Sequence, residues 1–160
     1  ILALESKVVD FAAVTSPLAI QKPLHKTHLA SYREILIGGT KYKELASQIR
    51  SLNDLSGIPF IGLADGTGSR ELYHRYFLSH GLMFAPDMEA ATTDQILPMI
   101  THNLGIGFYP EELAAEAIAR GNAYAIRLVE PIPEREICLV TNSSTQISAA
   151  VRKVISFLSV

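Results

Sequence analysis

The sequence is poor in cysteine, in clustered positive charge and in long apolar runs. Its single cysteine, Cys138, stands in the apolar run 137–140, so no disulfide can form within the chain, and we expect a buried strand thiol. The 14 lysines and arginines form no basic stripe and the net charge is −2, which disfavours direct nucleic-acid binding by this segment. No apolar stretch approaches the roughly 20 residues of a membrane span, and no signal-peptide pattern opens the chain. We therefore expect a cytoplasmic protein.

Motifs for nucleotide binding and for hydrolysis are also missing. Gly66 and Gly68 give the pattern G-x-G-x-x-E, with Glu71 where a dinucleotide-binding loop has its third glycine, and no P-loop lysine follows. A G-x-S-x-G nucleophile motif is absent. A Ser-His-Asp set is disfavoured, because His74 lies along the same predicted helix as the nearby serine and should point away from it. These absences favour binding without turnover over an enzyme, and we expect no cofactor.

Residues 60–77 contain a strand, a glycine loop and the start of a helix. The apolar run 60–63 gives way to small residues, and from Ser69 the apolar side chains recur at helical spacing. Either Ser69 or Thr67 could cap this helix. Such a loop directs free backbone N–H groups and the positive end of a helix dipole at one place. The stretch therefore favours a polar or anionic small ligand.

The rest of the chain alternates between strand and helix patterns. This alternation predicts an α/β fold with a mainly parallel sheet. The region 18–31 contains Pro23 and little periodicity, which predicts a connection. Strands are predicted over 8–14, 32–39, 60–63, 83–91 (most regular at 88–91), 103–110, 124–129 and 135–141, the last two joined by a kinked turn. One helix is predicted to end near residue 7 and a short one to lie within 45–55. Two further helices are predicted to begin at 69 and at 92–94, and two more to span 111–120 and 148–158.

Two hydroxyl residues, Thr15 and Ser16, follow the first strand immediately. Pro17 then prevents further ladder pairing. In open α/β sheets, ligands bind at the carboxyl ends of strands, so these hydroxyls are candidate ligand contacts; the alternative is that they only complete a turn. His25 and His28 are not expected to bind a metal, because no carboxylate or cysteine lies near them in the sequence.

The order of these signals resembles the effector-binding domain of LysR-type transcriptional regulators, whose fold is similar to that of type 2 periplasmic binding proteins. No single motif is highly specific, but the order and spacing together are, from about Val8 to the closing helix. The resemblance rests on VVDFAAVTSPL at 8–18, D-L-x-G-x-P-F-I-x-L at 54–63, DGTGSRELYHRYF at 65–77 and ATTDQILPMITHNLGIGFYPEELA at 91–114.

The resemblance implies two Rossmann-like lobes joined by two crossover strands, with a small-molecule cleft between the lobes. The first lobe would comprise 1–33 and 136–160, and the second lobe 34–135. It also implies a homodimer or tetramer formed through this domain. Ligand contacts carried over from the family pattern, in which hydroxyl residues at strand ends and helix starts line the pocket, are Thr15, Ser16, Gly66, Thr67, Gly68, Thr93 and Phe108.

Two parts of the family pattern are missing from this chain. The winged helix-turn-helix domain that carries family members to DNA is absent, and so is the opening strand-helix-strand unit of the first lobe. The chain also opens inside a helical pattern, so we expect a fragment with an incomplete first lobe. The resemblance implies the effector sensor of a transcriptional regulator, and the helix start and the hydroxyl residues favour a polar or anionic metabolite as the effector. The alternatives are a transport solute-binding protein of the same fold and a Rossmann-like enzyme, and the upstream coding sequence would discriminate among the three.

Overall fold

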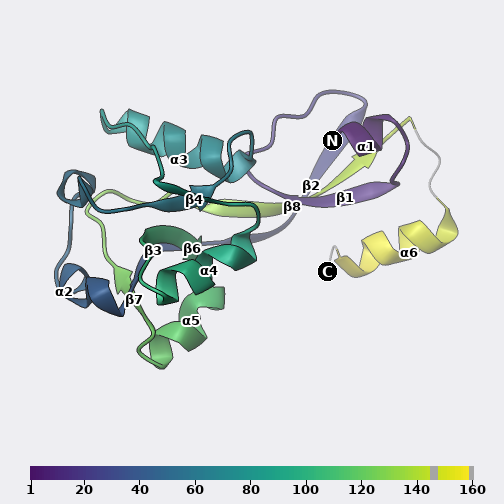
Figure 1. The fold of residues 1–160 in the computed structure, drawn as a ribbon. Coiled ribbons are helices and arrows are strands. Elements are labelled where there is room, and N and C mark those ends of the chain that lie inside the picture. Colours follow the sequence, from purple (N-terminus) through teal and green to yellow (C-terminus); the bar gives the residue numbers. More distant parts are fainter. Residues whose placement is uncertain (145–147, 159–160) are drawn as a thin grey trace. The chain divides into compact units, whose positions relative to one another are not determined.

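The computed structural model describes residues 1–144 and 148–158. The chain divides into two compact units (Figure 1), and it passes from the first to the second and back again. Unit 1 comprises Ile1–Tyr32 and Arg135–Val160, and unit 2 comprises Arg33–Glu134. These bounds lie one residue from those expected for the two lobes, and part of the expected segment 136–160 lies outside the described residues. The assignment of the units to the two lobes of a ligand-binding fold stays a prediction.

Unit 2 is built on a three-stranded sheet in the order β6-β3-β7, with β3 pairing antiparallel to both neighbours. A second, parallel pair, β4 and β5, lies alongside, and an isolated bridge joins Phe60 to Ile106 of β6. The strands are β3 (Glu34–Gly39), β4 (Ile61–Leu63), β5 (Met88–Ala90), β6 (Ile106–Pro110) and β7 (Ala123–Ile126); the helices are α2 (Lys43–Ala46), α3 (Gly68–Ser79), α4 (Thr93–Thr101) and α5 (Glu111–Ala119), with 3-10 turns at Thr40–Tyr42 and Leu52–Leu55.

Both faces of the unit 2 sheet are covered by helices. Successive side chains of a strand point to opposite faces, and in β3 the neighbours Leu36 and Ile37 are fully buried in different hydrophobic clusters. The cluster around Leu36 contains the aromatic side chains of α3, whereas the cluster around Ile37 contains side chains of α4 and α5. Figure 1 shows α3 on one side of these strands and α4 and α5 on the other. The start of α3 is therefore fixed by a packed core.

Unit 1 contains a three-stranded antiparallel sheet with β8 in the centre. Strand β8 (Arg135–Asn142) pairs with β1 (Phe11–Thr15) on one side and with β2 (Leu24–Tyr32) on the other. Leu4 of the short helix α1 (Leu2–Glu5) packs with Leu24 and Val140 in a small core. Cys138 of β8 is fully buried, as the sequence predicts. The sheet therefore joins the two chain segments of unit 1.

The helix ends follow the expected stop signals. Gly81 has a φ of 74° and its N–H donates to Leu78 O, which closes α3, and Gly121, with a φ of 72°, follows α5. Helix α4 continues through Pro98, which removes one backbone hydrogen bond from its interior. The closing helix, α6 (Ala149–Leu158), forms within the expected range. In the described residues, no helix has both the length and the apolarity that a membrane span requires.

The α/β class is confirmed, but the expected mainly parallel pairing holds only for β4 with β5 and for two isolated bridges. The remaining strand pairs described in the structure are antiparallel. The prediction rested on the alternation of strand and helix patterns along the chain. Helices and strands do alternate in unit 2, yet β3 pairs antiparallel with β6 and β7, so the alternation does not fix the direction of pairing.

Four element predictions need correction. The expected connection 18–31 contains β2, whose side chains are mostly exposed, so its sequence lacks the apolar signal of a strand. The segment 45–55 forms a 3-10 turn at Leu52–Leu55, after α2 has already ended at Ala46. The first strand begins at Phe11, because Lys7 has a φ of 58° and the chain turns there. The expected strands 124–129 and 135–141 belong to different units and do not pair with each other.

Candidate functional site

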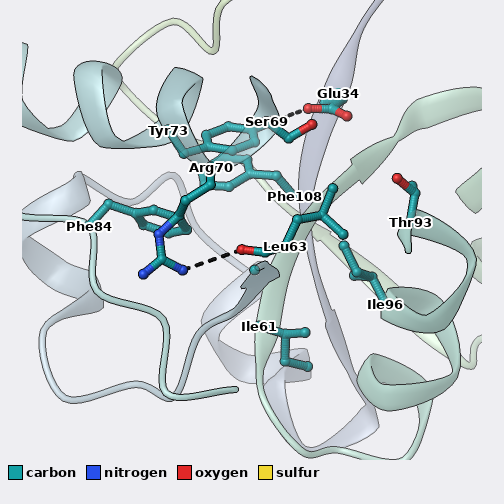
Figure 2. A pocket seen from close by; sticks show the side chains of 11 residues that line it. Glu34, Ile61, Leu63, Ser69, Arg70, Tyr73, Phe84, Thr93, Ile96 and Phe108 are labelled. Atoms are coloured by element: carbon teal, nitrogen blue, oxygen red, sulfur yellow. Dashed lines mark hydrogen bonds between the residues drawn. The ribbon is translucent and has the colours of Figure 1, made fainter. Parts of the chain in front are cut away.

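A narrow pocket lies within unit 2, where the starts of α3 and α4 meet the strands β3, β4 and β6 (Figure 2). Its cavity volume is about 20 Å³, which is room for one water molecule. Polar and aromatic side chains line most of it. The lining residues are Glu34, Ile61, Gly62, Leu63, Ser69, Arg70, Tyr73, Phe84, Thr93, Ile96 and Phe108.

Thr67 fixes the start of α3 beside this pocket. Its hydroxyl donates to Ala64 O (2.9 Å) and accepts from the N–H of Arg70 (3.2 Å), so Thr67 is the N-cap. Gly66, one residue earlier, has a φ of 79°, which a residue with a side chain adopts only with strain. This turn places Ser69 on the pocket wall, whereas Thr67 itself and the adjacent Gly66 and Gly68 do not line the pocket.

We expect Thr67→Ala to lower the free energy of unfolding by about 1 kcal/mol, because it removes the cap of α3. Thr67→Ser keeps the hydroxyl and is the matched control, with a loss well below that of the alanine variant. Urea unfolding followed by tyrosine fluorescence measures both. Equal stability of the alanine variant and the unmodified chain would contradict the role of Thr67 as a cap.

Aromatic rings form one wall of the pocket. The rings of Phe108 and Tyr73 stack with their centroids 4.0 Å apart and their planes 10° from parallel. Phe84 lies 5.8 Å from Tyr73 and 6.5 Å from Phe108, centroid to centroid. All three rings are buried and continue into the core beneath α3. The wall is therefore rigid, since moving one ring would disturb several others.

A buried carboxylate faces this aromatic wall. Glu34 is the first residue of β3, and only 7% of it is exposed to solvent. The Tyr73 hydroxyl donates a short hydrogen bond to Glu34 Oε2 (Figure 2). A buried carboxylate that accepts hydrogen bonds is compensated for the loss of water. Glu34 thus adds a carboxylate acceptor to the hydroxyl groups of the pocket wall.

The guanidinium of Arg70 interacts with groups along one edge of the pocket. Its Nη1 donates to Leu63 O at 3.4 Å (Figure 2) and lies 3.4 Å from Glu89 Oε1, and its Nε lies 3.6 Å from Asp65 Oδ1. The guanidinium carbon also lies 5.5 Å from the centre of the Phe84 ring. The positive charge of Arg70 is therefore shared with carboxylates of this unit.

Tyr76 continues the aromatic cluster along α3, beyond the pocket. Its hydroxyl donates to Glu130 O at 3.0 Å. Burial, with a smaller contribution from the negative charge of Glu130, raises the pKa of Tyr76 well above its usual range. Tyr76 therefore stays protonated and keeps this hydrogen bond at neutral pH.

Two of the seven residues expected to bind ligand, Thr93 and Phe108, line the pocket. Thr93 is the first residue of α4 and Phe108 lies in β6. Sequence reasoning did not assign Glu34 or Tyr73 to the site. The signal for Glu34 was a lone acidic residue at the head of a glycine-ended apolar strand, where a core side chain would be expected. Tyr73 fitted the apolar face of a helix and carried no separate signal.

Thr15 and Ser16 lie in unit 1, at the end of β1, and both use their hydroxyls within that unit. Thr15 Oγ1 accepts from Arg135 Nη2 at 3.1 Å, and Ser16 Oγ accepts from the N–H of Glu136 at 2.8 Å. The Arg135 guanidinium, which is almost completely buried, also donates to Ser16 O. These hydrogen bonds connect the end of β1 to the start of β8, and ligand contact by either residue stays a prediction.

Metal ligands do not gather anywhere in the described part of the chain, where no group of three or more His, Cys, Asp or Glu side chains could hold an ion. His25 and His28 lie on β2, paired opposite Thr141 and Cys138. The His28 ring instead contacts Ser31 Oγ at 3.1 Å. The pocket in unit 2 is the candidate site that the geometry supports.

The family model described as the LysR substrate binding domain matches residues 1–159. The chain belongs to this family. Two Escherichia coli relatives named uncharacterized HTH-type transcriptional regulator YeiE, one from strain K12, are 23% identical over 142 residues, which is 86% of this chain and 48% of the relative. The LysR substrate-binding domain described here therefore spans about half the length of the curated relatives it matches.

Solved structures of LysR-type regulators share the fold. The effector binding domain of QuiR in complex with shikimate has a TM-score of 0.81 at 17% identity, covering 99% of this chain and 74% of that one. The regulatory domain of Synechocystis PCC6803 CcmR in complex with 2-PG has a TM-score of 0.83, also at 17% identity, covering 99% and 76%. At this identity the likeness establishes the fold of the LysR domain and not its ligand.

Proposed function

We propose that this chain senses a small-molecule effector within a LysR-type transcriptional regulator. The observation that carries the proposal is the pocket in unit 2, in a chain of the LysR substrate binding domain family. The effector is a polar or anionic metabolite: Ser69 and Thr93 lie at the starts of two helices on the pocket wall, where N–H groups are available to polar ligands. Binding shifts the populations of two conformations of the regulator and so changes its hold on DNA.

The proposal also covers catalysis, assembly, cellular location and contact with DNA. The protein acts without catalysis, assembles as a homodimer or tetramer through this domain, and works in the cytoplasm. It contacts DNA only through a winged helix-turn-helix domain outside this chain. Ligand contacts by Thr15, Ser16, Gly66, Thr67 and Gly68 stay part of the proposal, in addition to those by Thr93 and Phe108.

The test compares two neighbouring threonines in the complete protein. Thr93 lines the pocket, whereas Thr92 is exposed and its side chain makes no capping hydrogen bond. Thr93→Tyr fills the cavity and is expected to weaken effector binding about tenfold or more through steric exclusion. Thr92→Tyr should bind as the unmodified protein does.

Calorimetry provides the measurement. The probes are shikimate, 2-PG and a panel of small carboxylates and sugars, and a thermal melt confirms that each variant is folded. Electrophoretic mobility shifts on the protein's own promoter, with and without the bound probe, test the link to DNA. Equal loss of binding in both variants, or an effector that binds without altering the DNA complex, would contradict the proposal.

A further inference from the structure

The polar groups of the pocket differ in charge, in the hydrogen bonds they can make and in burial. Four side chains with oxygen atoms line it, namely the carboxylate of Glu34 and the hydroxyls of Ser69, Tyr73 and Thr93. The hydroxyls can donate or accept, whereas the carboxylate only accepts. Glu34 and Tyr73 are buried, at 7% and 5% exposed, whereas Ser69 and Thr93 are half-buried. The carboxylate is therefore the group that decides which ligand atoms can enter.

The cation on the pocket wall, Arg70, is already engaged by other groups of the protein. Arg70 donates to Leu63 O and lies within ion-pair distance of Glu89 and Asp65. Figure 2 shows its guanidinium reaching toward Leu63 O, away from Glu34. An anionic ligand group in the pocket would meet the negative charge of Glu34 while Arg70 is already shared among other acceptors. Like charges at short distance repel, most strongly where water is excluded.

The dimensions of the cavity restrict entry to one small group. A volume of about 20 Å³ holds a single water-sized group, and the stacked rings of Tyr73 and Phe108 keep the wall from yielding. A hydroxyl or an ammonium has this size and donates hydrogen bonds. A carboxylate or a phosphate is larger and only accepts, so it meets the wrong partner in Glu34.

We infer that Glu34 determines the ligand class, because it accepts a hydrogen bond from a hydroxyl or ammonium group of the effector and excludes ligands that offer only carboxylate or phosphate oxygens there. The inference rests on the proposed function and sharpens it. An acidic effector fits only if it also carries a donating group, and that group is the part that enters the pocket. Tyr73 supports this role because its hydroxyl bond holds the Glu34 carboxylate in place.

The experiment uses the complete protein and four small probes whose binding is followed by ligand-observed saturation-transfer NMR. Glycerol carries only hydroxyl donors and ethanolamine carries a hydroxyl and an ammonium, so transfer to ethanolamine alone indicates the ammonium. Acetate and methanesulfonate carry no donating group at neutral pH. In the unmodified protein, we expect saturation transfer to glycerol, ethanolamine or both. We expect at least about tenfold less transfer to the two anions, which is the factor in binding that one hydrogen bond to a charged group contributes. This comparison needs no variant and so does not depend on how any substitution folds.

Glu34→Gln tests the residue itself. The amide keeps an oxygen that accepts from Tyr73 but replaces the other oxygen with a donor. We expect donor probes to bind about tenfold more weakly to this variant, with the anions unchanged or improved. Glu112→Gln, an exposed glutamate in the first turn of α5, is the control and should leave every probe unaffected.

The outcomes separate the inference from the proposed function. If the anions bind and the donor probes do not, or if Glu34→Gln leaves their ratio unchanged in a folded protein, the role of Glu34 is wrong while the effector site stands. If no probe binds the unmodified protein, the inference is overturned; the proposed function then fails only if the calorimetric panel also finds no effector.

Discussion

Phe108→Ala is expected to lower the free energy of unfolding by about 4 kcal/mol, because it deletes a ring that the core cannot replace by relaxing. Phe108 is 5% exposed and stacks on Tyr73 at 4.0 Å between centroids. Its ring centre also lies 6.1 to 6.5 Å from those of Phe60, Tyr76, Phe77 and Phe84. Removing it leaves a cavity bounded by stiff aromatic side chains. Urea unfolding followed by tyrosine fluorescence measures the loss.

Met83→Ala is the matched control for this truncation. Met83 belongs to the same unit but is 80% exposed, and the change should stay within about 0.5 kcal/mol of the unmodified chain. Five of the six tyrosines lie in unit 2, so the fluorescence signal reports mainly on the unit that both substitutions alter. A cost below about 1 kcal/mol for Phe108→Ala would show that the aromatic cluster repacks, contrary to the rigid wall described above.

Gly39→Ala should cost about 3 kcal/mol, since the added methyl group would meet backbone that cannot rotate away. A Cβ at this position would lie 2.2 Å from Ile100 O and 2.5 Å from Asn103 Oδ1. Asn103 is itself fixed, because its Oδ1 accepts from the N–H of Lys41 at 2.8 Å. The end of α4 must therefore move away from β3 to admit the methyl group. Thermal and urea unfolding of the variant both test this expectation.

Gly57→Ala separates crowding from backbone strain. A Cβ at Gly57 meets no atom within 4 Å, but its φ of 77° is unfavourable for alanine and should cost about 1 kcal/mol. Gly39→Ala is expected to be clearly the less stable of the two variants. If the two losses were equal, the close approach between β3 and the end of α4 would be looser than the distances indicate.

Sequence reasoning performed best where local chemistry decides the structure. The strand, loop and helix over 60–77 are confirmed, because an apolar run, a threonine cap and helical spacing are all local signals. Both glycine stops, Gly81 and Gly121, are confirmed for the same reason. Strand direction and the existence of β2 were missed, since both depend on distant partners: β2 is specified by pairing with β8, more than 100 residues away.

The candidate site was predictable only in part. Thr93 and Phe108 were expected from the resemblance to the family pattern, and both line the pocket. Glu34 and Tyr73 are 39 positions apart, and their hydrogen bond exists only because α3 packs over β3. Thr67 attracted a ligand-binding prediction from its hydroxyl, yet in the structure that hydroxyl is used by the backbone of the helix start. A hydroxyl at a cap is thus an ambiguous signal, since capping alone accounts for it.

Because β8 is the central strand of the unit 1 sheet, this sheet can form only late in synthesis on the ribosome. Within the described chain, the sheet of unit 1 pairs β1 and β2 only through β8, which is synthesised after the whole of unit 2. Unit 2 is a continuous segment and has all its strands before β8 emerges, so it can fold first. During that interval β1 and β2 present unpaired edges, which are the parts of the nascent chain most exposed to mispairing.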